Sequence, residues 1–168
     1  MTRLFTSTIV AAALLLAWSE SAFAQGGRGF IDPAAFGQPT QVLSTNPIGL
    51  ALRYYNVEYE SRVTDAITGG IGGASLSESL GLGSYLNGDV FLRYYPGGHA
   101  FQGVSVGLKA GLTSSNGIAA GIGFDLNANH WINDRVVMSA GVGLKSVFDG
   151  ADTYTLPTIR IINVGIAF

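Results

Sequence analysis

Eight charged side chains have the types and spacing to do chemistry, because each interrupts an otherwise apolar or glycine-rich segment. They are Glu58, Glu60, Arg62, Asp89, Arg93, Lys109, Asp125 and Lys145. Four are acidic and four are basic, so their formal charges cancel. On one face of a set of strands, evenly matched charges can form ion pairs. A pore that selects ions of one sign would carry a biased set, so these residues predict a network of salt bridges.

Residues suited to catalysis are scarce in this chain. The two histidines, His99 and His130, both fall in predicted turns, where polar turn residues are the simpler interpretation. A serine nucleophile with a carboxylate base is conceivable at Ser77, Glu78 and Ser79. Two serines around one glutamate in a turn are a weak pattern, however, so no catalytic residue and no enzyme activity are predicted.

Metal, cofactor and nucleic-acid sites are not predicted either. The chain has no cysteine, which excludes thiolate metal sites and disulfides. Asp149 and Asp152 lack a third ligand at the spacing of a calcium loop. The glycine-rich segment 69–73 lies inside a predicted strand rather than before a helix, so it is not a phosphate-binding loop. Charged residues make up 12% of the chain without any basic stripe, which argues against a nucleic-acid partner.

The segments that carry the charges are predicted β-strands. Apolar residues occupy every second position in run after run, and turn-forming residues separate the runs. In 101–115, for example, Val106 and Leu108 alternate with Gly107 and Lys109. The predicted strands are about 41–52, 55–63, 66–77, 81–95, 101–113, 117–129, 135–147 and 156–168. The expected fold class is therefore all-β, an eight-stranded antiparallel barrel.

The apolar alternation changes phase between the first two predicted strands. Apolar residues fall at even positions up to Leu52 and at odd positions from Tyr55 onward. One long strand would need a bulge here, whereas a two-residue hairpin loop at Arg53 and Tyr54 removes the conflict and is the preferred prediction.

The pairing of Lys109 follows from counting through the turn at 96–100. This count places Lys109 opposite Asn87, with Asp89 on the diagonal, where a lysine side chain can reach it. An ion pair between Lys109 and Asp89 is therefore predicted.

The apolar face of the strands is predicted to face outward into a membrane. A soluble sandwich would need about a quarter of its residues as surface charges, about twice the 12% present in this chain. The polar faces hold mostly glycine and small polar residues, while the apolar faces are unbroken and bordered by aromatic residues. These features are typical of transmembrane β-barrels, and the interior of an eight-stranded barrel is only wide enough for side chains.

The N-terminal segment has the features of an export signal. Arg3 precedes the apolar stretch 4–18, and Ala22-Phe23-Ala24 forms a small-x-small cleavage site, which predicts a signal peptide over 1–24. Residues 25–40 are expected to form a flexible leader, with a plug folded back into the barrel as the alternative. The barrel is expected to span 41–168.

The signal peptide, the alternating strands and the C-terminal segment 163–168 resemble small Gram-negative outer-membrane β-barrels. In those proteins the barrel-assembly machinery reads a C-terminal aromatic residue preceded by alternate apolar residues, which implies this role for Phe168. The segment 46–72 also resembles outer-membrane barrel families that begin with Asn-Pro-Leu-Gly-type residues and reach a Tyr-Glu pair. The resemblance covers about 41–168. It implies the cell outer membrane, contact with its lipid and lipopolysaccharide, and a monomer.

A periplasmic C-terminus is also implied by the resemblance. The periplasmic turns would be 62–65, 96–100 and 130–134, and the outer loops 53–54, 77–80, 114–117 and 149–155. Such outer loops are very short for a receptor, adhesin or protease. The leading hypothesis is a structural, envelope-integrity role with a plugged lumen. A narrow channel or carrier for small solutes is the alternative, and a lipid-A-modifying enzyme is a third hypothesis, because one scaffold carries many functions.

Overall fold

The computed structural model describes residues 39–51, 53–77, 84–115, 117–150 and 152–168. The predicted signal peptide 1–24 and nearly all of the predicted leader 25–40 lie outside the described residues. The possibility that the leader plugs the barrel falls there too.

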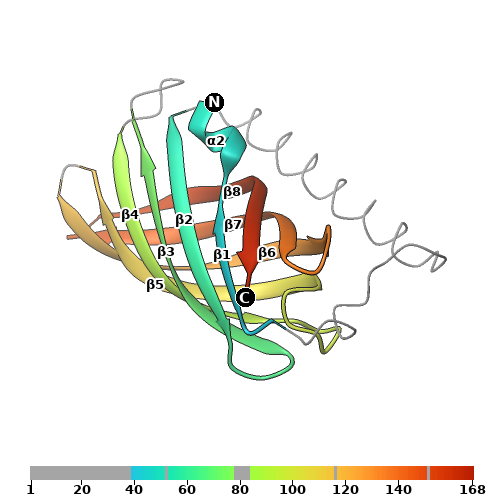
Figure 1. Ribbon diagram of the computed structural model, residues 1–168. Coiled ribbons are helices and arrows are strands. Elements are labelled where there is room, and N and C mark those ends of the chain that lie inside the picture. Colours follow the sequence, from blue (N-terminus) through green and yellow to red (C-terminus); the bar gives the residue numbers. More distant parts are fainter. Residues whose placement is uncertain (1–38, 52, 78–83, 116, 151) are drawn as a thin grey trace, which may run out of the picture. The chain divides into compact units, whose positions relative to one another are not determined.

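The described chain forms eight strands and one short helix (Figure 1). The strands are β1 Gln41–Thr45, β2 Tyr54–Arg62, β3 Ile67–Leu76, β4 Tyr85–Tyr94, β5 Gly103–Ser114, β6 Ile118–Trp131, β7 Val136–Asp149 and β8 Asp152–Ala167, and the helix is α2 Pro47–Ala51. Each strand pairs antiparallel with the next, and β1 pairs with β8, so the sheet closes into a barrel. This confirms the predicted fold class. No helix among these residues is long and apolar enough to cross a membrane.

The apolar face of the strands lies on the outside of the barrel. In β5, Leu108 is 70% exposed and Leu112 is 56% exposed, whereas Ser105 is fully buried and Lys109 is 9% exposed. The other strands alternate in the same way because successive side chains of a strand point to opposite faces. The predicted outward apolar face and inward charged face are both confirmed.

Glycines make room for large side chains inside the barrel. A Cβ atom at Gly70 would lie 2.5 Å from the Phe91 ring, and one at Gly121 would lie 2.8 Å from Cε of Lys145. A Cβ atom at either position would force its neighbours to shift. The narrow interior is therefore filled by alternating large side chains and glycines, as the sequence predicts.

The start of β1 and the end of β8 lie at one end of the barrel, which we call the termini end; the other end is the loop end (Figure 1). The turns at 63–66, 95–102 and 132–135 also lie at the termini end. A cluster of buried apolar side chains packs inside this end, formed by Val42, Phe101, Trp131, Val137 and Ala167. The interior is therefore apolar at the termini end and polar toward the middle.

The junction between β1 and β2 differs from both structures considered for it. β1 ends at Thr45 rather than at residue 52, and α2 follows it. Tyr54 is not a loop residue, because it begins β2 and pairs with Leu76 of β3. The predicted hairpin loop at Arg53 and Tyr54 is therefore wrong, and so is a single bulged strand.

Local chemistry explains the short helix. Oδ1 of Asn46 accepts a hydrogen bond from the backbone N–H of Gly49 at 2.8 Å, which is an N-cap, and Pro47 takes the first helical position, where no N–H is needed. A Cβ atom at Gly49 would lie 2.6 Å from the carbonyl oxygen of Tyr54. Arg53, with φ of 56°, then turns the chain into β2.

The last strand also differs from its prediction. β8 begins at Asp152 rather than at residue 156, so the hairpin turn is shorter than the predicted loop 149–155. A register shift lies farther along, where Ser139 pairs with Asn163 but Gly141 pairs with Arg160. β8 therefore has one extra residue at this point, and such a bulge reverses which face the following side chains occupy.

Candidate functional site

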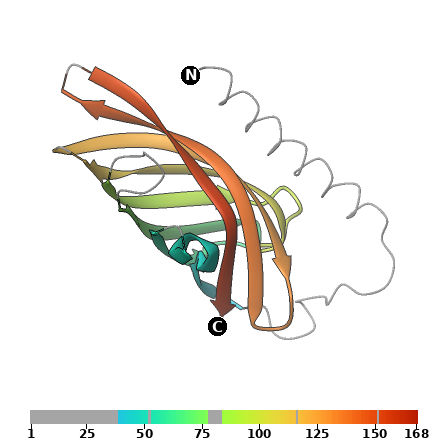
Figure 2. The same ribbon diagram turned by 90° about the horizontal axis from the view of Figure 1, so that it is seen from above.

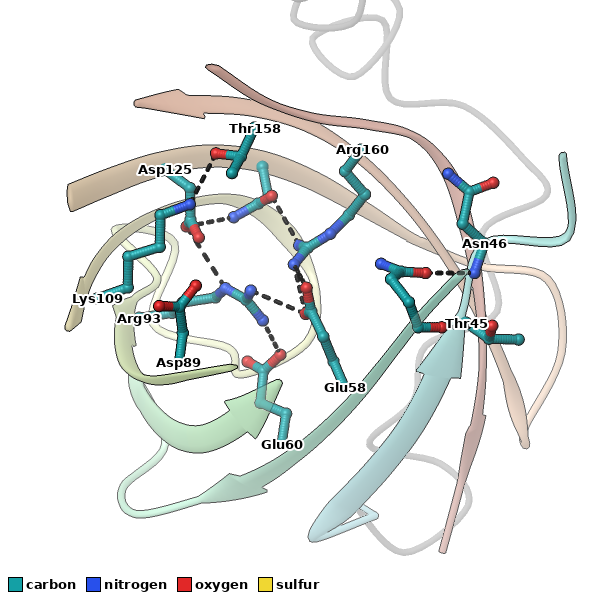
Figure 3. A network of polar contacts seen from close by, with 12 residues as sticks. Thr45, Asn46, Glu58, Glu60, Asp89, Arg93, Lys109, Asp125, Thr158 and Arg160 are labelled. Carbon is teal, nitrogen blue, oxygen red and sulfur yellow. Dashed lines mark hydrogen bonds and ion pairs between the residues drawn. The ribbon is translucent and has the colours of Figure 1, made fainter. Parts of the chain in front are cut away.

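Inward charged side chains of β2, β4, β5, β6, β7 and β8 meet in the middle of the barrel (Figure 3). Seven of the eight predicted residues take part: Glu58, Glu60, Asp89, Arg93, Lys109, Asp125 and Lys145. Arg62 lies apart from them at the termini end, where its Nη1 is 3.8 Å from Oδ1 of Asp65 and its Nη2 donates to the carbonyl oxygen of Pro39. Together with Arg160, the seven form the charge network.

Arg93 is the centre of the charge network. Its guanidinium donates to Glu60, to Oε2 of Glu58 at 3.0 Å and, through Nε, to Oδ1 of Asp125 at 3.5 Å. Its Cζ atom also lies 3.9 Å from the centre of the Phe91 ring. The side chain is only 3% exposed. Arginine suits this position because its planar group presents several donors in fixed directions.

Glu60 connects the charge network to the apolar cluster. Its carboxylate accepts hydrogen bonds from Thr68 and, at 2.9 Å, from the hydroxyl of Tyr95. The Tyr95 ring packs edge-on against Phe101, with ring centroids 6.4 Å apart. The polar and apolar parts of the interior are therefore one continuous packed region.

Lys145, not Lys109, pairs with Asp89, so the predicted pair is wrong. Nζ of Lys145 donates to Oδ1 of Asp89 at 2.5 Å and to Oδ1 of Asn87 at 2.6 Å. Lys109 stands opposite Phe91 rather than opposite Asn87. The partner of Lys109 is displaced by four residues, from Asn87 to Phe91, because β5 begins only at Gly103 and the turn between β4 and β5 is longer than the predicted 96–100.

Lys109 has a different environment from the other basic residues of the charge network. Its Nζ donates to Oγ1 of Thr158 at 2.7 Å. Within the described part of the chain it forms no ion pair, whereas Arg93, Lys145 and Arg160 each form at least one. Lys109 therefore keeps unused donor capacity inside the barrel.

Arg160 is the functional residue that the sequence analysis missed. Its Nη1 donates to Oδ1 of Asn127 at 2.7 Å, and its Nη2 donates to both carboxylate oxygens of Glu58. Counting back from the C-terminus in steps of two places Arg160 on the outward face, and only the bulge in β8 turns it inward. An arginine within an outward apolar run was the available signal for that bulge, because a charge does not fit an otherwise apolar face.

The charge network remains balanced after this correction. With Arg160 in place of Arg62, the interior holds four acidic and four basic side chains. A cavity of about 60 Å³ remains beside them, and its lining includes three acidic and three basic side chains, Glu58, Asp89, Asp125, Arg93, Lys109 and Arg160, together with Thr158. This volume holds a few waters or one small polar group.

The structure separates the residues considered for catalysis. Ser77 follows β3 at the loop end, whereas His99 and His130 lie at the termini end. Glu78 and Ser79 lie outside the described residues. Among those described, no three His, Cys, Asp or Glu side chains are grouped to hold a metal ion. A Ser-His pair is therefore not formed by these residues.

Comparison of the chain with known protein families, curated proteins and solved structures finds no match. Its function is therefore inferred from the residues that line the inside and outside of the barrel.

Proposed function

We propose that the chain is an integral β-barrel protein of the bacterial outer membrane, with a closed lumen and a structural role in the envelope. The observation that carries this proposal is the apolar outer surface of the barrel. It includes Leu43, Val57, Ile71, Leu86, Val90, Leu92, Leu108, Leu112, Ile118, Ile122, Phe124 and Ile166, all between 47% and 77% exposed. A closed barrel pairs its backbone groups within the sheet, as the interior of a bilayer requires.

Exposed aromatic residues near the strand ends also support a membrane location. Tyr94 and Phe168 lie at the termini end, and Tyr55 and Phe148 lie toward the loop end, each 45% to 61% exposed. Barrel proteins of the outer membrane carry such aromatic girdles at both lipid–water boundaries. We expect the chain to act as a monomer in contact with membrane lipid and lipopolysaccharide.

The packed interior favours a structural role over a channel or carrier. Ion pairs cross the middle of the barrel, apolar side chains fill the termini end, and the cavity between them is about 60 Å³. In planar lipid bilayers, the purified protein should therefore give conductance near the background. Steady, sizeable conductance would reject the closed lumen and favour the channel.

Outer-membrane insertion is tested by Leu108→Arg. Leu108 is 70% exposed, so in a soluble protein an arginine here would change stability little. Near the middle of a bilayer it should cost about 2–4 kcal/mol of unfolding free energy. Denaturant titration after refolding into lipid vesicles measures this cost, and the inward substitution Ser105→Ala is the control, expected to cost about 1 kcal/mol or less. Equal effects of the two variants would count against the membrane location.

Phe168 is expected to act as an assembly signal in cells. Its backbone also closes the barrel, because its N–H donates to the carbonyl oxygen of Gln41 and its own carbonyl oxygen accepts from the N–H of Gln41, both at 3.0 Å. Deleting Phe168 should lower the yield of heat-modifiable, membrane-inserted protein. Phe168→Ala keeps the backbone hydrogen bonds, so it should lower the yield in cells but leave refolding in vitro unchanged. Phe124→Ala should leave both the yield in cells and refolding in vitro unchanged. Normal outer-membrane levels of both Phe168 variants would remove this role.

The proposal includes no catalysis and no cofactor. The third hypothesis, a lipid-A-modifying enzyme, predicts an altered lipid A in a deletion strain. Mass analysis of lipid A from that strain should instead match the parent strain.

A further inference from the structure

The wall of the barrel has a gap in strand pairing between β2 and β8. β1 pairs with β8 over only four positions, from Val42 opposite Ala167 to Thr45 opposite Val164. β8 continues to Asp152, and β7 follows its other edge over nearly the whole length. Within the described part of the chain, no strand pairs with the β1-side edge of residues 152–163. We call this unpaired edge the seam.

Helix α2 lies at the seam without being bonded to it. α2 contacts both β2 and β8, and Figure 2 shows β8, in red, running past the teal helix. The hydrogen bonds anchor the start of the helix to β2 alone: Oγ1 of Thr45 donates to the carbonyl oxygen of Asn56 at 2.6 Å, and the N–H of Asn46 donates to Oδ1 of Asn56 at 2.7 Å. Among the described residues, no backbone hydrogen bond joins α2 to β8. Its side chains Ile48 and Leu50 face outward, 42% and 49% exposed.

The contact between Arg160 and Glu58 joins β8 to β2 inside the barrel: Arg160 lies in the unpaired stretch of β8, and Glu58 lies opposite Ser44 near the end of β1. Arg160 comes from β8 and Glu58 from β2, and Figure 3 shows their side chains reaching toward each other from these two strands. The cavity lies directly beside this ion pair, and Thr158 and Lys109 also line it. If α2 moved away from β8, the cavity would open to the outer surface of the barrel. The N–H groups of Lys109 that are not bonded to Thr158 could then be reached from outside.

A β-strand from another protein is a poor candidate for the seam. Pro157 lies within the free stretch of β8 and has no N–H to donate to an added strand. Proline on an edge is one of the devices that prevent strand addition. The cavity, in contrast, has room for a group of a few atoms but none for a hydrocarbon chain.

We propose that the seam is a lateral opening for a single-chain amphiphile with a carboxylate headgroup, that is, a fatty acid. The carboxylate enters the cavity and binds Lys109 and Arg160, while the acyl chain passes between α2 and β8 and lies against Ile48 and Leu50 in the membrane. A carboxylate suits the site because Lys109 forms no ion pair with the described residues, and arginine and lysine both donate strongly to carboxylates. This inference rests on the proposed membrane location.

The test uses the full barrel refolded into phosphatidylcholine nanodiscs. The probes are stearate with a nitroxide at carbon 5, and its methyl ester, followed by electron paramagnetic resonance. The wild type should immobilise the acid at least tenfold more tightly than the ester, and Lys109→Met should remove this difference. Arg62→Met, which removes a charge at the termini end, should keep the preference for the acid over the ester. Lys109→Gln serves the same purpose if the methionine variant does not fold.

The route of the acyl chain is tested by relaxation enhancement of backbone amides in the same nanodiscs. The nitroxide should broaden amides of α2 and of β8 near Pro157 more than outward positions of β5. Equal binding of acid and ester, an unchanged preference in Lys109→Met, or strongest broadening at the loop end would each overturn the lateral opening. Failure of the protein to insert into lipid would instead reject the proposed function, so the two failures are distinguishable.

Discussion

Arg93→Met should destabilise the barrel more than any other single change in the charge network. The substitution leaves Glu58, Glu60 and Asp125 without the guanidinium that they share. Breaking one buried ion pair costs about 3–5 kcal/mol, a large part of the 5–15 kcal/mol that typical domains have. Refolding into lipid vesicles should fail, or the urea midpoint should fall sharply, as followed by heat-modified migration on gels.

Two variants separate charge from geometry at this position. Arg93→Lys keeps the charge, but an ammonium cannot reach three carboxylates in the directions that a guanidinium does, so an intermediate loss is expected. Arg62→Met also removes one charge, but the carboxylate that pairs with Arg62, Asp65, is 87% exposed, so a smaller loss than for Arg93→Met is expected. A normal urea midpoint for Arg93→Met would show that these ion pairs do not hold the interior together.

Lys145→Met should cost about 3–5 kcal/mol, because it leaves the carboxylate of Asp89 buried and unpaired. Lys145 is 1% exposed and Asp89 is 10% exposed, so solvent screens this pair little. The double variant Lys145→Met with Asp89→Asn should cost much less than the sum of the single variants. Urea titrations of the four proteins in lipid vesicles give the coupling energy directly.

Lys109→Met is the matched comparison for Lys145. Both lysines point into the barrel, but Lys109 donates to Thr158 and forms no ion pair with a described residue. Its loss should therefore cost only the net value of a hydrogen bond, about 0.5–1.5 kcal/mol. Additive energies for Lys145 and Asp89, or a larger loss at Lys109 than at Lys145, would contradict the pairing seen in the structure.

The sequence alone determined the barrel and which side chains face inward and outward along most strands. This was possible because the alternation of a strand is a local property: the period of two is readable without knowing which strand lies next to which. It placed Leu108 outside and Lys109, Asp125 and Lys145 inside, as observed. The low share of charged residues then favoured an outward apolar face over the charged surface of a soluble sandwich.

Only the tertiary structure decided which charges touch. Partners are set by register, and register depends on turn lengths and bulges that alternation does not reveal. The longer turn before Gly103 moved Lys109 away from Asn87, and the bulge in β8 brought Arg160 inside to meet Glu58. The capped turn at Asn46 likewise replaced a strand with a helix, because its hydrogen bonds to Gly49 and Asn56 outweigh a pattern of alternate apolar residues. A periodic sequence therefore defines the faces of a barrel, while side-chain contacts across strands define its interior.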